Sequence, residues 1–174
     1  MKRTSKKRVA ALVITCALLI VGGAAVFAST GAAHMFTSRP EIKIALTASV
    51  HRGQADLPIE KAEAIGSGEV VSWNIVSSNV GNGQAHDYVT VGQIPKGTSF
   101  VEGSAKAEGR VLVTYSIDGG KTFTATPMVA EKQPDGSTKQ VIAPVSIYTQ
   151  VRYEWADPLA AGGKLSAFYQ VRVK

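Results

Sequence analysis

Two sets of side chains in this sequence could hold a metal ion. The first is the three histidines, His34, His51 and His86. They stand far apart, and none has a Cys or His partner at the spacing of a zinc site. The second is Asn79, Asn82 and Asp87, whose oxygens could bind Ca²⁺. Because Asn-Gly sequences use the same oxygens to build tight turns, we expect turns here, and we predict no metal and no cofactor.

Residues that could act as a nucleophile or as an acid–base pair show no catalytic spacing. A serine nucleophile needs a frame such as Gly-x-Ser-x-Gly, which Gly66-Ser67-Gly68 lacks. The carboxylates are scattered, and no pair is placed for glycoside hydrolysis. We therefore expect no catalytic residue and no enzymatic activity. A hydrolase whose site is assembled only by folding is the open alternative.

The most regular spacing belongs to a segment suited to hydrogen bonding within a turn, Ser116-Ile117-Asp118-Gly119-Gly120-Lys121-Thr122-Phe123. It resembles the Asp-box, a hairpin motif that occurs on several β folds. Asp118 can accept hydrogen bonds from backbone N–H groups of its own turn, and Gly120 can supply a positive φ. Phe123 can fold its ring under the hairpin as a core element. A glycan or calcium contact is the alternative, but we interpret six residues as a structural turn: Ser116, Asp118, Gly119, Gly120, Thr122 and Phe123.

The N-terminus carries the pattern of an export signal. Five cations in the first eight residues precede Val9 to Ala28, a run of twenty residues without a charge. This pattern predicts an apolar export helix, with a signal peptide over residues 1–28 that is cleaved after Ala28 or Ala33. The rest of the chain is then extracytoplasmic. Twenty apolar residues are also just enough to span a bilayer, so an uncleaved anchor is the alternative. Cys16 lies in mid-run, and we interpret it as part of the apolar stretch.

The charge balance argues against a nucleic-acid partner. The chain has a formal net charge of +6, but from Ser29 onward 14 basic residues face 13 acidic ones, intermixed along the chain. A nucleic-acid binder keeps a basic face after processing, which this composition does not offer. The mature part has no cysteine. Its roughly 140 residues can bury enough apolar surface to fold as one domain without disulfides.

The elements that would position these residues are β-strands. Apolar and polar residues alternate with the period of a half-buried strand in six runs, at residues 42–50, 71–75, 88–91, 111–117, 151–155 and 165–173. Turn formers separate the runs, and helical periodicity is absent apart from a turn near residues 59–64. The pattern predicts an all-β protein, an immunoglobulin-like antiparallel β-sandwich of seven to eight strands. We expect it to span residues 41–174, after a linker at 29–40.

Some aromatic and loop residues add detail to this prediction. Trp73 and Trp155 fall on apolar positions, and we expect core rings between two sheets there. Tyr88 or Tyr148 could form an exposed platform for sugars, although no neighbouring pattern supports that role. Residues 127–144 are polar in their middle, and we expect a long hairpin or an exposed loop.

Several short segments occur in a characteristic order: Asn79-Val80-Gly81, Ile94-Pro95-Lys96-Gly97-Thr98-Ser99-Phe100, Val113-Thr114-Tyr115-Ser116 with Asp118-Gly119-Gly120, Tyr148-Thr149-Gln150-Val151, and Phe168-Tyr169-Gln170-Val171-Arg172-Val173. Residues 68–174 thereby resemble the bacterial "conserved repeat" cell-surface domain, an immunoglobulin-like module known as domain of unknown function eleven. The resemblance implies a surface location and a sandwich fold. The family often has an Asp where this chain has Gly92-Gln93, and it commonly occurs in tandem copies, whereas one copy is present here.

These observations predict an exported protein that acts by binding or assembly. The leading function is a structural or adhesive component of the cell envelope or surface, whose partners are other envelope or surface proteins or further copies of itself. We expect the contact at open edges of the first and last strands, at residues 41–50 and 165–173, where the linker at residues 30–40 of a neighbour could lie along the edge. Arg172 and Lys174 put charge on the last strand, a common guard against such pairing. A periplasmic or secreted module that recognises a glycan or peptide is the second function, and the hydrolase is the third. Membrane contact is expected only through an uncleaved N-terminal segment.

The small residues after the apolar run give a test of processing. We predict that the exported protein begins at Ser29 or His34, because both sites follow small residues at the −3 and −1 positions. N-terminal sequencing of the exported protein checks this. Recovery of an intact Met1 start in the membrane fraction would identify an anchor instead.

Overall fold

The structure is a computed structural model that describes residues 37–53 and 55–174. These residues form β-strands and two short 3₁₀ turns, Ile59–Lys61 and Val145–Ile147, so the all-β prediction is confirmed. No helix in these ranges has the length and hydrophobicity needed to cross a membrane. Four sequence features lie outside the described residues: the export segment, its cleavage sites after Ala28 and Ala33, Cys16 and His34.

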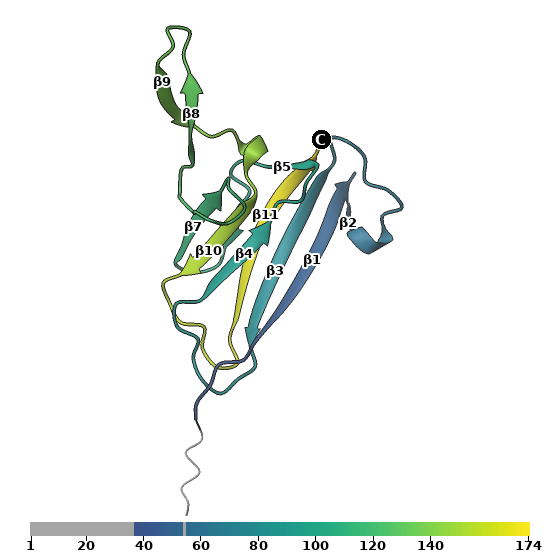
Figure 1. Cartoon of the computed structure of the whole chain (residues 1–174). Coiled ribbons are helices and arrows are strands. Elements are labelled where there is room, and N and C mark those ends of the chain that lie inside the picture. Colours follow the sequence, from purple (N-terminus) through teal and green to yellow (C-terminus); the bar gives the residue numbers. More distant parts are fainter. Residues whose placement is uncertain (1–36, 54) are drawn as a thin grey trace, which may run out of the picture. The chain divides into compact units, whose positions relative to one another are not determined.

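The larger sheet is antiparallel and has the order β2-β1-β3-β11-β5, with β6 also pairing on β11 (Figure 1). Its strands are β1 (Ile42–Arg52), β2 (Ala55–Pro58), β3 (Val70–Asn79), β5 (Thr98–Phe100), β6 (Lys106–Ala107) and β11 (Lys164–Val173). The long strands β1, β3 and β11 coincide with three of the predicted runs. Their alternating apolar residues form the inner face of the sheet, since successive side chains of a strand point to opposite faces.

The position of the last strand corrects one expectation. β11 lies inside the larger sheet, between β3 on one side and β5 with β6 on the other. Residues 165–173 are therefore not an open edge. The prediction failed because it took the place of a strand in the sheet from its place in the sequence, whereas long connections bring this last strand beside β3.

The smaller sheet holds β4 (Val89–Gln93), β10 (Gln150–Trp155) and β7 (Val111–Ser116) in the order β4-β10-β7. β10 pairs with both neighbours in antiparallel register. These three strands confirm the other predicted runs. The described residues contain eleven strands in all, more than the seven to eight expected. Three of the additional ones, β2, β5 and β6, have only two to four residues, too few for alternation to be recognised. The other two form the hairpin at residues 127–144.

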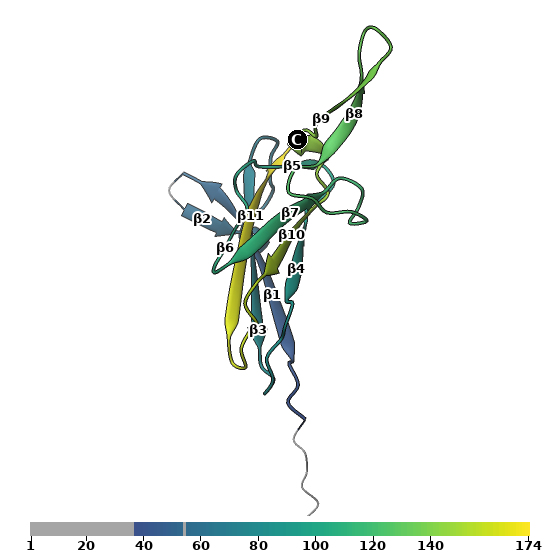
Figure 2. The same cartoon turned by 90° about the vertical axis from the view of Figure 1, so that its left-hand side faces the viewer.

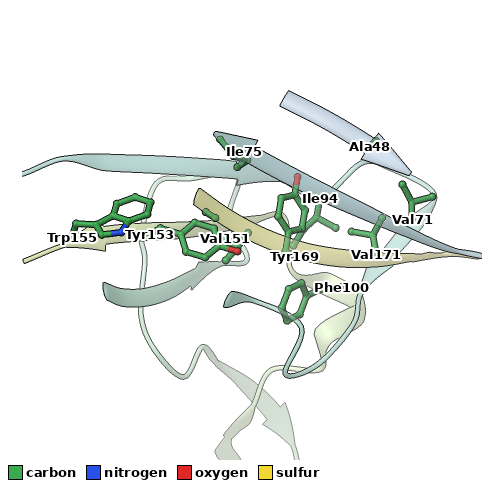
Figure 3. Close-up of a cluster of buried hydrophobic side chains, with 11 residues drawn as sticks. Ala48, Val71, Ile75, Ile94, Phe100, Val151, Tyr153, Trp155, Tyr169 and Val171 are labelled. Carbon is green, nitrogen blue, oxygen red and sulfur yellow. The ribbon is translucent and has the colours of Figure 1, made fainter. Parts of the chain in front are cut away.

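The two sheets face each other across an apolar core, as in a β-sandwich (Figure 3). From the smaller sheet come Val151, Tyr153 and Trp155, which are at most 3% exposed. The Tyr153 hydroxyl donates to the Phe168 carbonyl at 2.7 Å, and the Trp155 indole donates to the Glu108 carbonyl at 2.9 Å. Each buried polar tip thus has the partner that its desolvation requires. Trp155 has the core position predicted for it.

Residues 127–144 form a hairpin rather than an open loop. It consists of β8 (Met128–Lys132) and β9 (Thr138–Ile142), which pair with each other and with no other strand of the described chain. Both views show this hairpin standing clear of the two sheets, at the same end as the C-terminus (Figure 2). The turn Pro134-Asp135-Gly136 closes it, with Gly136 at a φ of 84°.

The start of β1 is held by the turn that follows β3. The Asn79 side chain is 1% exposed and makes four hydrogen bonds. Its Nδ2 donates to the carbonyls of Gly83 at 2.6 Å and Leu159 at 3.1 Å. Its Oδ1 accepts from the N–H groups of Glu41 and Gly81, both at 3.1 Å. One buried amide therefore joins three segments that are distant in sequence.

The neighbouring Asn82 completes this contact. Its Oδ1 accepts from the Arg39 N–H at 2.8 Å, while the Arg39 carbonyl accepts from the N–H groups of Asn82 and Gly83. A Cβ at Gly83 would lie 2.8 Å from the Arg39 nitrogen, so only glycine allows so close an approach. The amide oxygens of Asn79 and Asn82 are thus engaged by backbone N–H groups, as in the turn that the Asn-Gly sequence predicts.

We predict that Asn79→Ala destabilises the domain by about 2–4 kcal/mol, because it leaves several buried backbone groups without partners. Chemical denaturation followed by intrinsic fluorescence measures the loss. The matched control is Asn74→Ala on the exposed face of the same strand, which should change stability by less than about 0.5 kcal/mol. Equal stability of the two variants would contradict the proposed role of Asn79.

Candidate binding cleft

A cleft opens between β1 and β4 because the smaller sheet does not cover the whole inner face of the larger one. Gly92 of β4 lies against the Tyr169 ring, so β4 sits over β11. In the larger sheet, β3 separates β11 from β1. The first half of β1 therefore has no strand opposite its inner face.

Two aliphatic side chains on that uncovered stretch face solvent. Ile44 is 59% exposed and Leu46 is 56% exposed, although they alternate in phase with Ala48 and Val50, which are buried. Across the cleft, Val91 of β4 is 38% exposed. Thr90 and Gly92 are the buried residues of β4, so Val91 points away from the core at the edge of that strand. Ile44 and Leu46, in contrast, belong to the inner face of β1, which the opposite sheet of a sandwich normally covers, so their exposure shows that this part of the inner face is uncovered.

The cleft has an apolar lining and a volume of about 190 Å³. Its walls come from four strands and the turn after β4: Ile44, Leu46, Trp73, Ile75, Thr90, Val91, Gly92, Gln93, Pro95 and Tyr169. Pockets for small-molecule ligands usually enclose about 300–1,000 Å³. The observed volume is smaller and suits one or two aliphatic side chains of a partner.

Both rims of the cleft are open strand edges. β4 pairs only with β10 among the described strands, which leaves its other edge free. β2 pairs with β1 only from Ser49 to Arg52, so the stretch from Ile42 to Ala48 has a free edge as well. A free edge presents unpaired N–H and C=O groups, which can accept an additional strand. The cleft thus combines an apolar floor with backbone hydrogen-bonding groups.

The lining offers little acid–base chemistry. No Asp, Glu, Lys, Arg or His contributes to it, and Tyr169 is its one titratable side chain. The Tyr169 hydroxyl donates to the Gln93 carbonyl at 2.6 Å, and burial raises the pKa of this phenol to about 12. It therefore remains protonated near neutral pH.

Trp73 forms part of the cleft floor and differs from Trp155. Its ring is half-buried and stacks on Tyr169, with ring centroids 6.4 Å apart and planes 13° apart. Its indole nitrogen is buried and has no hydrogen-bond partner among the described residues, whereas that of Trp155 is paired. Buried polar groups are usually satisfied. The sequence-based expectation of a core ring therefore holds fully for Trp155 and only in part for Trp73.

The Ser116–Phe123 segment lies away from the cleft and forms a hydrogen-bonded turn. Asp118 Oδ1 accepts from the Ser116 hydroxyl at 2.7 Å and from the N–H groups of Lys121 and Thr122, both at 3.0 Å. The Thr122 hydroxyl donates to Oδ2 at 2.6 Å. These bonds, with those from Thr122 the strongest, hold the pKa of Asp118 far below its usual range. The carboxylate is thus occupied by its own turn.

The glycines and the aromatic residue of this turn have distinct environments. Gly119 and Gly120 have φ values of 76° and 90°, in the left-handed region. Gly119 N–H also donates to the Thr149 hydroxyl at 3.1 Å. Phe123 is half-buried beneath the Arg152 guanidinium, 5.5 Å from the ring centroid, and lies outside the main core cluster. Phe123 is therefore not a core ring as expected. Its ring makes a cation–π contact with Arg152 instead.

The other candidate residues are dispersed in the structure. His51 contacts Asp56 at 3.0 Å on the surface, while His86 and Asp87 are exposed. Among residues 37–53 and 55–174, no group of three His, Cys, Asp or Glu side chains gathers as a metal site would. Tyr88 and Tyr148 are half-buried and pack on Trp155 and Phe100, respectively, so neither forms an exposed platform for sugars.

The cleft itself was not anticipated from the sequence. Alternation placed Ile44 and Leu46 on the inner face of their strand, but it cannot show whether another strand lies opposite. One available signal was Gly92 within an apolar run, since glycine inside a strand often marks close approach of another group. Comparisons with protein-family models, with curated proteins and with solved structures found no match. The resemblance to the conserved-repeat domain therefore stays a prediction.

We predict that Gly92→Ala destabilises the fold by about 1–3 kcal/mol, because the new Cβ would lie 2.9 Å from the Tyr169 Cζ. Tyr169 is buried and anchored through its hydroxyl, so it cannot move aside easily. Thermal unfolding measures the effect. Gly66→Ala is the matched control, since its Cβ meets nothing closer than 3.7 Å at an ordinary φ. A wild-type melting temperature for Gly92→Ala would show that β4 does not pack on Tyr169.

Proposed function

We propose that this chain is an exported structural or adhesive protein of the cell envelope or surface, which acts by association with other proteins and not by catalysis. The observation that carries the proposal is the cleft between β1 and β4, where an exposed apolar floor lies between two open strand edges. The N-terminal pattern of cations followed by an uncharged run supports export.

The unguarded edges favour a protein partner. Soluble proteins usually protect an open strand edge with charges, proline or a bulge. β4 has the sequence Val89-Thr90-Val91-Gly92-Gln93, without a charge or a proline, and Lys43 is the one charged residue between Ile42 and Ala48. Addition of a strand would pair these backbone groups and cover the aliphatic side chains together. An open strand edge without these protective features is best explained by a role in binding a partner strand.

The chemistry of the cleft favours a polypeptide over a glycan. A sugar-binding site needs several polar groups to fix the hydroxyls beside an aromatic face. This lining has the aromatic residues Trp73 and Tyr169, but Thr90 and Gln93 are its main polar side chains. The small apolar volume suits alternate side chains of an extended segment. The proposed partner is therefore an extended polypeptide segment with aliphatic side chains on one face.

The immunoglobulin-like relationship belongs to the same proposal. Two antiparallel sheets around a common core support it. The strand order differs from that of immunoglobulin constant domains, which have the orders A-B-E-D and C-F-G, whereas here β11 lies between β3 and β5. We therefore propose an immunoglobulin-like sandwich of the kind found in surface domains, without the strand order of the immunoglobulin constant domains.

We predict that Leu46→Lys reduces association of the exported protein by tenfold or more, since burial of a leucine contributes roughly 1.5–3 kcal/mol. Sedimentation velocity on the exported protein and its retention in the envelope fraction measure this. The control is Leu112→Lys on β7, whose side chain is 55% exposed and lies outside the cleft. If Leu46→Lys associates like the wild type while remaining folded, the cleft is not the contact surface.

A further inference from the structure

Phe168 of β11 is an aromatic residue on the outer face of the larger sheet. Its neighbours in sequence, Ala167 and Tyr169, are buried in the core, so the Phe168 side chain points to the opposite face, where it is half-buried. Every other Phe, Tyr and Trp ring of the described residues pairs with a second ring or, for Phe123, with a guanidinium. The Phe168 ring has no such neighbour on its own chain.

Two hollows flank this ring. The first has a volume of about 270 Å³ and lies toward β3 and β1. The second has a volume of about 230 Å³ and lies toward β6. Phe168 contributes to the lining of both, so its ring stands between them. The volume of the first hollow is close to the lower limit for small-molecule sites, about 300 Å³.

Polar side chains line the first hollow in two rows beside the ring. In one row, Thr47 lies opposite Asn74, and Asn74 lies opposite Phe168. In the next row, Ser49 lies opposite Ser72. Neighbouring strands are about 4.8 Å apart, so these hydroxyl and amide groups stand at intervals of about the width of a sugar ring.

Most of these polar groups are available to a ligand. The Ser72 hydroxyl accepts from Gln170 Nε2 at 3.0 Å. The side chains of Thr47, Ser49 and Asn74 take part in none of the hydrogen bonds that join the described residues. A hydroxyl and an amide can each donate and accept. The set can therefore satisfy hydroxyl groups of a ligand, which also do both.

The outer face around the ring carries no charge. No Asp, Glu, Lys or Arg occupies an outward position at residues 45–49, 72–78 and 166–170 of the described strands. Exposed faces usually include such residues, because these are the types most often found at the surface. Glu60, from the 3₁₀ turn after β2, is the one charged residue in the lining of the first hollow. The face therefore suits a neutral, hydroxyl-rich ligand.

We infer that the first hollow, together with the Phe168 ring, is a binding site for a neutral glycan. The electron-rich face of an aromatic ring attracts the C–H groups on one side of a sugar ring, while the hydroxyl and amide side chains bind the sugar hydroxyls. The Glu60 carboxylate adds a strong acceptor. This site lies on the face opposite the cleft and does not depend on the proposed association.

A polypeptide is the less favourable occupant of this face. The backbone groups beneath the hollow are already paired in the ladders of β3 with β1 and with β11. An added strand would find no free N–H or C=O group there, unlike at the edges of the cleft. The hollow also lacks a second large apolar side chain beside Phe168. Its recognition chemistry is that of hydroxyl groups around one ring.

The test measures how far the exported protein is retarded in native gels that contain a neutral polysaccharide: a β-glucan, a galactomannan or an arabinoxylan. Gels with anionic alginate are run for comparison. We expect retardation of the wild type in a neutral gel. Phe168→Leu keeps an apolar side chain but removes the ring, so it should weaken binding roughly 3- to 10-fold. Phe168→Tyr should bind like the wild type. The matched control is Phe123→Leu, which replaces a half-buried ring outside both hollows and should not affect binding.

Two further variants separate this inference from stability and from the proposed function. Asn74→Ala should weaken glycan binding roughly 2- to 10-fold while the protein remains as stable as the wild type. Leu46→Lys should bind the polysaccharide normally, and Phe168→Leu should self-associate normally, because the two surfaces are separate. The inference is overturned by retardation in alginate alone, by no retardation in any neutral gel, or by equal retardation of the wild type, Phe168→Leu and Asn74→Ala.

Discussion

The contact between Gly92 and Tyr169 sets the arrangement on which the rest of the molecule depends. The ring of Tyr169 rises from β11 against the backbone of β4, and its hydroxyl is fixed by the Gln93 carbonyl. β4 is thereby placed over the middle of the larger sheet. The other edge of the three-stranded sheet, β7, lies over β5, where the rings of Tyr115 and Phe100 are 5.2 Å apart, and not over β1. The exposed inner face of β1 follows from this one contact.

A structural feature can be predicted from the sequence when the residues that determine it lie close together in the chain. Alternation identified the six main strands because it reflects which side chains of a strand face the core, as with Val151, Tyr153 and Trp155. Alternation contains no information on which strands are neighbours, so the interior position of β11 and the uncovered Ile44 could not be deduced. Those features depend on contacts between residues that are distant in sequence.

The hydrogen-bonded turns could be predicted from the sequence more completely than the strand order. Asn79, Asn82 and Asp118 belong to short segments in which glycines permit tight turns, and their oxygens accept hydrogen bonds from nearby N–H groups. Part of this network is not local, however: the Asn79 amide also reaches the Leu159 carbonyl, 80 positions away. That bond makes Asn79 a tertiary element as well as a turn residue, and nothing in the Asn-Gly pattern predicts it.

The interior place of β11 has a consequence for how the chain acquires its fold. β3 is paired on one side with β1, which precedes it closely, but on the other side with β11, where Val71 meets Val171. A sheet whose centre depends on such distant pairing folds slowly, because a long loop must close before the contacts form. The chain therefore remains open until its last strand is available. For the export proposed above, this delay would keep the core from closing before the chain has crossed the membrane.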